Sequence, residues 1–487
     1  MRTIRIPVIV AVLALATSCT VGPDYVKPVV DVPADYKERQ GWKVAEPRDD
    51  AIRGDWWQLF RDPELSALEA RVDVSNQTVV VAEAQLRQAR ALVEQARAGY
   101  FPTVTAGASV TRSRQSSASG GASTGSTSGG TRAPTGTFTD YTLPVDASWE
   151  LDLWGRIRRT VESSRAGAQA TAADLESARL AVHAELAQDY WELRALDAET
   201  RLFEATVAAF TKSLELTRNR YASGVVSRAD VLQAETQLKT TQAQAIDVGV
   251  QRAQLEHAIA VLLGEPASTF SVPVVPLATA PPDIPVSLPA ALLERRPDIA
   301  AAERRMAAAN AGIGIAEAAF FPTVTLSASA GFSASALASW LSWPSRFWAV
   351  GAALAETLFD AGLRRAQTDQ ARAAYDASVA SYRQTVLTGF QEVEDNLAAL
   401  RILEEEARVQ DEAVSAARQS VAVTTNQYRA GVVGYLDVVV AQTTALANER
   451  TAVDIAGRQM TASVLLVKAL GGSWRATELE AATTWDR

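Results

Sequence analysis

The sequence predicts a mainly α-helical chain that is a tandem duplication and carries one β-hairpin in each half. Three observations predict this class. Short motifs recur in the same order in both halves: the run from Tyr221 to Val226 returns 207 residues later as the run from Tyr428 to Val433. Apolar residues recur at every seventh position over long stretches, which is typical of coiled-coil packing. Over shorter stretches, apolar and polar residues alternate, which indicates half-buried strands.

Composition limits the chemistry that the chain can carry. Its 487 residues are 48% apolar and have a formal net charge of −9, so a large core is possible and a nucleic-acid partner is not expected. A single cysteine excludes disulfides within the chain and cysteine-based zinc sites. The two histidines, His183 and His257, are too few for a histidine metal cluster or acid–base centre. We therefore expect no enzyme activity, no cofactor and no metal.

The amino terminus has the parts of an export signal. Arg2 and Arg5 precede the apolar residues 6–16, and small residues lead to Cys19. Residues 1–18 are predicted to be a lipoprotein signal peptide and Cys19 its lipidation site; the alternative is an ordinary cleaved signal with an incidental cysteine. The apolar run is too short to cross a bilayer as a helix, which takes about 20 residues. No later segment has the pattern of a transmembrane helix, so any membrane-spanning part has to be closed β-structure.

Each half contains a predicted hairpin whose strands have about 10 residues, long enough to cross a bilayer when tilted. The first hairpin covers residues 103–153, and its first strand alternates from Val104 to Val110. The Ser-, Gly- and Thr-rich residues 113–136 within it predict a flexible exposed loop of unknown role. The second hairpin covers residues 323–359, and the alternation of its last strand is ambiguous. Four strands cannot close a barrel, whereas several copies could pool theirs.

A long helix is predicted after each hairpin. In the second half its heptad row includes Val386, Val393 and Leu400, and we interpret such residues as packing rather than as a cofactor site. Gly224 and Gly431 are predicted to end the long helices in the left-handed conformation. Shorter helices then return through residues 231–263 and 438–470.

These features divide the chain into six segments. Each repeat is expected to run as helix, hairpin, long helix, tip turn and helix. The segments are the signal peptide (1–18), an N-terminal tether and equatorial segment (19–70), the first repeat (71–271), a Pro-rich linker (272–297), the second repeat (298–472) and a C-terminal equatorial tail of unassigned role (473–487).

Three motifs look functional but lack the context that their chemistry needs. Residues 121–125 match a nucleophile elbow, yet they lie in a Ser/Gly tract without the flanking strand and helix. Gly312 and Gly314 begin like a dinucleotide-binding loop, but the third glycine is missing. The run from Glu404 to Glu406 is interpreted as a solvated helix face rather than a metal site; a ring of pore-lining charge stays an alternative.

Motifs along nearly the whole chain occur in a specific order. They are C-T-V-G-P-D-Y from Cys19, D-W-W from Asp55, L-L-E-R-R-P-D-I from Leu292 and F-P at Phe321. Together they resemble the NodT-type lipoproteins of the outer membrane factor family, the TolC-like efflux proteins.

The resemblance implies a homotrimer. Its three chains would pool their strands into a twelve-stranded barrel in the outer membrane, continued by a long α-helical coiled-coil tunnel in the periplasm. It also implies a passive exit duct that conducts drugs or other small toxic compounds out of a tripartite efflux pump. The implied partners are a periplasmic membrane-fusion adaptor, an inner-membrane transporter of the resistance-nodulation-division class, and outer-membrane lipid.

By resemblance, the two tip turns contact the adaptor. Their residues are Tyr221, Gly224, Val225, Val226 and Ser227 in the first repeat and Tyr428, Gly431, Val432, Val433 and Gly434 in the second. Family members often place Arg before the second Tyr and Asp before a later Ala-Gln, and these charges hold the tip shut. Gln427 and Val440 occupy those positions here, which argues against an ion-pair gate. Asp230 and Asp437 are the nearest retained acids and are candidate gate residues.

Three alternative functions stay open at this point. The exit duct of a type I protein-secretion system has the same architecture, and the choice of adaptor cannot be inferred from the tip. A trimeric surface adhesin also pools four strands per chain, but its strands cluster at the carboxyl end instead of lying in two repeats. An enzyme is disfavoured, because the sequence contains no catalytic constellation.

Overall fold

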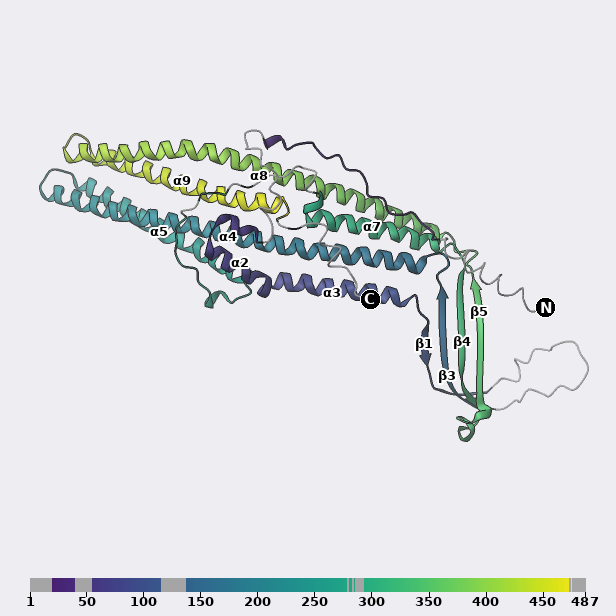
Figure 1. Cartoon of the computed structure of the whole chain (residues 1–487). Coiled ribbons are helices and arrows are strands. Elements are labelled where there is room, and N and C mark those ends of the chain that lie inside the picture. Colours follow the sequence, from purple (N-terminus) through teal and green to yellow (C-terminus); the bar gives the residue numbers. More distant parts are fainter. Residues whose placement is uncertain are drawn as a thin grey trace, which may run out of the picture. The chain divides into compact units, whose positions relative to one another are not determined.

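The computed structural model describes residues 20–39, 55–114, 137–277, 280–282, 284, 293–472 and 474 (Figure 1). The predicted signal peptide, Cys19, residues 115–136 and nearly all of the predicted C-terminal tail lie outside these ranges. The chain forms two compact units. The sheet unit comprises Met1–Val26, Ala89–Gly167 and Arg305–Ser378, and the helical unit comprises Lys27–Gln88, Ala168–Arg304 and Val379–Arg487.

Helices make up most of the described chain, which confirms the mainly helical class. The α-helices are α2 (Pro63–Ser75), α3 (Gln77–Ala98), α4 (Arg156–Ala222), α5 (Arg228–Leu262), α7 (Pro297–Ala318), α8 (Leu363–Arg429) and α9 (Tyr435–Ala469). Short 3₁₀ turns are η1 (Lys37–Arg39), η2 (Trp56–Phe60), η4 (Ala267–Thr269), η5 (Leu337–Ser339) and η6 (Trp343–Ser345). Helices of the two halves match in length: α3 and α7 have 22 residues, α4 and α8 have 67, and α5 and α9 have 35.

The helical unit has its main apolar core around α2, α4, α8 and α9. Val393 and Leu400 of the predicted heptad row are buried in this core, as their spacing predicts, and so are Leu186 and Leu193 of α4. Aromatic residues close it where η2 leads into α2: Trp56, Trp57 and Phe60 pack with Tyr190 and Trp191. None of the described helices is long and apolar enough to cross a membrane.

The start of α2 shows how the sequence fixes a helix end locally. The side chain of Asp62 accepts hydrogen bonds from the backbone N–H groups of Glu64 and Leu65, both at 2.9 Å. Pro63 occupies the first helical position, where no backbone N–H is needed. Asp62 also accepts a hydrogen bond of 2.8 Å from the hydroxyl of the buried Tyr190, so this cap fastens α2 to α4.

The sheet unit contains one antiparallel sheet with the strand order β1/β2, β3, β4, β5. Figure 1 labels β1, β3, β4 and β5 in this order. Its strands are β1 (Thr103–Ala106), β2 (Ser109–Arg114), β3 (Thr137–Leu151), β4 (Thr323–Ala334) and β5 (Arg346–Ala355). These strands lie in the two segments predicted as hairpins. The pairing of β3 with β4 joins the hairpin of the first half to that of the second, which leaves β1/β2 and β5 as the two edges.

The predicted first strand is divided into β1 and β2 by a proline in its partner. Both pieces pair with β3 in one continuous register. Gly107 donates its N–H to the carbonyl oxygen of Pro144 at 3.0 Å, but Pro144 has no N–H to return. The ladder is therefore interrupted for one step without a change of register.

The two faces of the sheet differ in polarity. Two residues that are paired across antiparallel strands have their side chains on the same face of the sheet. The register therefore tells on which of the two faces each side chain lies. The apolar face carries Val104, Val110, Tyr141, Leu143, Val145, Trp149, Val324, Leu326, Phe332, Trp348, Val350 and Leu354. The opposite face carries Thr103, Thr105, Thr142, Asp146, Ser148, Ser327, Ser329 and Gly351, with a 2.6 Å hydrogen bond from Ser329 to Asp146.

The register also resolves the ambiguous strand. Trp348, Val350 and Leu354 of β5 lie on the apolar face, because their partners on β4 belong to that face. Ala349, Gly351 and Ala353 lie on the polar face, and all are small. The sequence alternation was ambiguous because small apolar residues stand where polar ones are expected.

Candidate functional site at the two helix turns

The candidate site consists of the turns that join α4 to α5 and α8 to α9 in the helical unit. Gly224 and Gly431 have φ angles of 73° and 77°, in the left-handed region that glycine adopts without strain. Gly224 donates its N–H to the carbonyl of Tyr221 at 2.9 Å, and Gly431 to that of Tyr428 at 3.0 Å. Val225 and Val432 each donate to a carbonyl five residues earlier, which completes a Schellman motif in both turns.

Asp230 and Asp437, the candidate gate acids, cap the helices that follow the turns. The Asp230 carboxylate accepts from the backbone N–H and the hydroxyl of Ser227, both at 2.9 Å. The Asp437 carboxylate accepts from the backbone N–H of Gly434 at 3.0 Å. Carboxylates are favourable in the first turn of a helix because they compensate the helix dipole. This structural role accounts for both acids, and a gating role stays a prediction.

The two turns differ in the burial of their tyrosines, although their sequences are similar. Tyr221 is 46% exposed, whereas Tyr428 is 3% exposed. Of the other predicted tip residues, Val226 and Val433 are half-buried and the following are exposed: Gly224, Val225, Ser227, Gly431, Val432 and Gly434. Tyr428 packs edge-on against Tyr435 with ring centres 5.5 Å apart, in a small core that also includes Phe210 and Leu238.

Arg220 joins the two helical pairs at the turns and was not singled out from the sequence. It donates from Nη1 to the carbonyl oxygen of Tyr428 at 2.6 Å, and its guanidinium lies 4.6 Å from the Tyr428 ring centre. The carbonyls at the end of α8 lack helical partners, so a cation there is favourable. The only sequence signal for Arg220 was its position directly before Tyr221. In the structure it contacts Tyr428 instead.

Apolar side chains are exposed on both turns and on the helices that follow. Val225 is 61% exposed and Val432 is 72% exposed. Leu232, Leu436 and Val440 are 53%, 58% and 57% exposed. Exposed apolar residues that cluster are typical of surfaces that bind other proteins.

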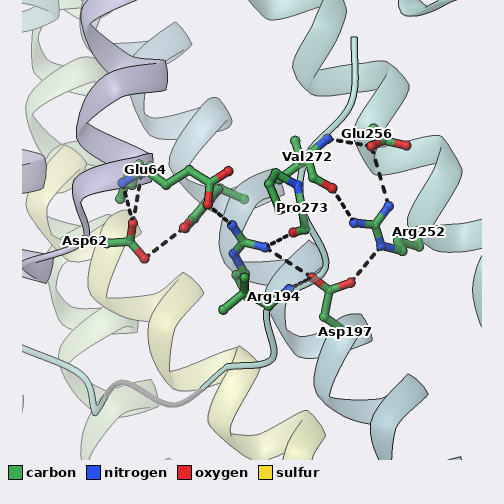
Figure 2. Close-up of polar contacts among 11 residues, drawn as sticks. Asp62, Glu64, Arg194, Asp197, Arg252, Glu256, Val272 and Pro273 are labelled. Atoms are coloured by element: carbon green, nitrogen blue, oxygen red, sulfur yellow. Dashed lines mark hydrogen bonds and ion pairs between the residues drawn. The ribbon is translucent and has the colours of Figure 1, made fainter. Parts of the chain in front are cut away.

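A second polar feature lies deeper in the helical unit and holds the start of the predicted linker (Figure 2). Arg194 donates to Glu64 at 2.7 Å, to Asp197 at 3.2 Å and to the carbonyl of Pro273 at 2.6 Å. Asp197 also accepts from Arg252 at 2.7 Å, and Arg252 donates to the carbonyl of Val272 at 2.8 Å. Because its charges are paired, this buried network positions the chain after α5 rather than binding a ligand.

A buried histidine joins α2 to α4. His183 lies with Nδ1 at 2.6 Å from Glu69 and Nε2 at 3.3 Å from Asp73, and its ring stacks on Trp57. Burial raises the pKa of Glu69 to about 7. Burial lowers the pKa of His183, but its hydrogen bond to Glu69 and the carboxylates of Glu69 and Asp73 outweigh this, so that the His183 pKa is raised. Arg179 is the cation on α4 that faces Asp73.

We expect this group to make stability depend on pH. Both pKa values are higher in the folded chain than in an unfolded one, so the folded state retains protons that the unfolded state releases. The stabilisation is fully present below the ordinary glutamate pKa of 4.5, and it is lost as pH rises through about 7, the folded pKa of Glu69, and through the raised pKa of His183. Raising the Glu69 pKa from 4.5 to about 7 corresponds to about 3 kcal/mol of linked stability. A chain of 487 residues loses about 1 °C per kcal/mol, so the unfolding temperature should fall by about 3 °C over this range. A double variant, His183→Gln with Glu69→Gln, should have a shallower slope, and the rest belongs to Asp189, whose pKa burial raises to about 7. A slope equal to that of the wild type contradicts the assignment.

Comparison with known proteins finds relatives over almost the whole chain. The profile of the outer membrane efflux protein family matches residues 68–265 and 288–472. The chain is 32% identical to the toluene efflux pump outer membrane protein TtgC of Pseudomonas putida, over 94% of this chain and 93% of that protein. It is 31% identical to the solvent efflux pump outer membrane protein SrpC of Pseudomonas putida, over 96% of this chain and 98% of that protein. Among solved structures, the outer-membrane channel OprN matches with a TM-score of 0.85 and 32% identity, covering 94% of this chain and 100% of that one.

Proposed function

The chain belongs to the outer membrane efflux protein family, and we propose that it works as a homotrimeric exit duct within a tripartite pump. Its role as an outer-membrane exit duct of efflux pumps is carried by one observation, the match over more than nine tenths of both chains to efflux proteins and to a solved outer-membrane channel. To this role the proposal adds the homotrimeric assembly, the adaptor and transporter as partners, and the lipid anchor at Cys19.

The sheet supports the trimeric assembly. One face is apolar and uncovered, as a lipid-facing surface requires, and the other carries hydroxyls and acids that suit a water-filled interior. Among the residues that the structure describes, neither edge of the sheet has a further partner strand, and an open edge is unstable in a bilayer. Three copies that each contribute four strands, with β1 and β2 acting as one, form a closed twelve-stranded barrel.

The tip supports an adaptor partner. Val225 and Val432 present apolar side chains on two well-defined turns, which suits a contact with the α-helices of a periplasmic membrane-fusion adaptor. An inner-membrane transporter of the resistance-nodulation-division class supplies the energy, because a duct has none of its own. Cys19 carries lipid that holds the amino terminus at the outer membrane. Asp230 and Asp437 are retained as candidate gate residues beside their capping role.

Matching helix lengths in the two halves support the tandem duplication. The family profile also matches the chain in two parts, on either side of the predicted Pro-rich linker. We retain the predicted boundaries, with the first repeat at residues 71–271 and the second at residues 298–472.

The function is tested by deleting the gene in its source organism and measuring susceptibility to antibiotics, solvents and detergents. We expect the deletion to sensitise the cell and the wild-type gene to restore resistance, because the duct is the last step of export. The alternative, protein secretion, predicts instead that susceptibility is unchanged while a secreted protein disappears from the medium. The relatives named for toluene and solvent efflux favour the first result.

A further inference from the structure

The two open edges of the sheet end in uncovered apolar residues at the side where the strands meet the helices. Beyond β5, Leu358 is 90% exposed and Phe359 is 86% exposed. At the start of β1, Phe101 is 68% exposed and Val104 is 63% exposed. Exposing leucine and phenylalanine side chains to water costs free energy. We therefore expect the apolar residues at both edges to be buried against another surface.

The junction between β3 and β4 shows how such residues are covered inside one chain. The last residues of β3 pair with β4 alone, from Trp149 opposite Leu326 to Leu151 opposite Val324. Beyond β3, the Trp154 ring stacks on Phe321 with centres 4.9 Å apart, and its N–H donates to the carbonyl of Pro322 at 2.7 Å. Phe321-Pro322 precedes β4 as Phe101-Pro102 precedes β1.

The same pairing registers predict which residues of the two open edges lie opposite each other when two copies meet. Thr103 pairs with Ser148 in the first hairpin, and Thr323 pairs with Ala355 in the second. Ala355 therefore corresponds to Ser148, and Leu358 corresponds to Leu151. Since Leu151 lies opposite Val324, its counterpart Leu358 belongs opposite Val104 of another copy, and Phe359 belongs opposite Thr103.

Strand lengths agree with this correspondence. β3 continues three residues beyond its pairing with β1, because β4 on its other side still offers partners. β5 stops at Ala355, level with the first residue of β4, because none of the described strands lies on its other side. β1 and β5 also run in opposite directions, so a second copy can add its β1 to β5 as the next antiparallel strand.

A pocket of about 810 Å³ lies beside Thr103 and Ser148, at the start of β1. Its lining includes Phe101, Thr103, Glu150 and Ile157. Thr103 and Glu150 lie on the polar face of the sheet, and a residue opposite Thr103 shares that face. The register thus directs Phe359 of another copy to the face on which this pocket lies.

We propose that residues 356–359 of one copy extend β5 along β1 of the next copy and that Phe359 occupies this pocket. Leu358 covers Val104 on the apolar face at the same step. A phenylalanine that is nearly fully exposed in one copy loses about 150–250 Å² of accessible surface when it is buried in this way. The inference rests on the proposed homotrimer, to which it adds the register and the residue that fills the contact.

The register is tested by disulfide cross-linking in the outer membrane. Cysteines placed opposite each other in an antiparallel pair have Cα atoms about 4.5–5.5 Å apart, which a disulfide spans. The pair Leu358→Cys with Val104→Cys should give a reductant-sensitive ladder that ends at a covalent trimer. In the control pair, Leu358→Cys with Val110→Cys, the two positions are offset by about 20 Å along the strand, so no cross-linked ladder should form. Each single variant controls for bonds that involve Cys19.

The outcomes separate this inference from the proposed function. If the protein restores drug resistance and assembles as a trimer, but only the offset pair or neither pair cross-links, the register is wrong and the duct stands. If the wild-type protein forms no trimer at all, both proposals fail.

Phe359 is tested by substitution. Phe359→Asp should reduce the trimer fraction in mild detergent at least tenfold, and Phe359→Leu should retain it. The matched control is Leu341→Asp, which changes a residue 66% exposed in the turn between β4 and β5 at the other end of the sheet. A Phe359→Asp protein that assembles like the wild type overturns the role of this side chain.

Discussion

A variant with Val225→Asp and Val432→Asp is expected to fail to restore drug resistance to the deletion strain. Both valines are exposed at the helix turns, so the substitutions leave the buried tip core intact. They place two carboxylates in a surface proposed to contact the adaptor. Burying unpaired charge costs several kcal/mol, so binding should weaken by about 100-fold or more. Resistance should then fall to the level of the deletion strain.

The matched control carries Val250→Asp with Val409→Asp, which changes exposed valines within α5 and α8 instead of at the turns. It should restore resistance, and both variants should form trimers in equal yield. Full resistance from the turn variant would mean that these valines do not contact the adaptor. Binding of purified trimers to the adaptor provides a direct second measurement.

Replacing Arg194 by methionine is expected to destabilise the helical unit by about 3–5 kcal/mol, the usual cost of breaking a buried ion pair. Arg194 is 2% exposed and pairs with Glu64 and Asp197. Without it, the carbonyl of Pro273 loses its 2.6 Å donor, and the segment after α5 loses an attachment to α4 (Figure 2). Methionine fills part of the space that arginine leaves. The loss of stability therefore reports mainly the lost charge and hydrogen bonds, and less the formation of a cavity.

Arg408→Met provides the control for this substitution. Arg408 pairs with Glu412 on the same helix, but both side chains are mostly exposed, and such pairs contribute about 0–1 kcal/mol. Denaturant unfolding followed by helical circular dichroism should separate the two variants clearly. Equal midpoints would show that the buried network does not stabilise the fold.

Local patterns predicted the elements well, because helices, strands and turns depend on neighbouring residues. The glycines that end α4 and α8 have the left-handed φ angles that their motif requires. Strand alternation gave both hairpins, but the division at Gly107 depends on Pro144 in another strand. A long-range partner decides such a feature, and no local period reports it.

In the candidate site, too, the sequence predicts what neighbouring residues determine and misses what depends on residues far apart in the chain. Tyr221 and Tyr428 occupy the same place in a repeated motif, and the sequence gives no reason to distinguish them. Their burial differs because Tyr428 packs against Tyr435 in the small core at the turns, with the guanidinium of Arg220 over its ring. The network around Arg194 was missed for a related reason: Glu64, Asp197 and Arg252 are far apart in sequence and meet only when α2, α4 and α5 pack.

The equal lengths of α4 and α8 constrain how this gene can change. Deleting one residue from an α-helix turns everything beyond it by about 100°, since a turn takes 3.6 residues. Such a deletion in α4 would point Tyr190, Leu193 and Arg194 away from their partners at once. Insertions and deletions should therefore accumulate in the connections and not in the 67-residue helices, and changes of helix length that survive should come in multiples of seven, the heptad period.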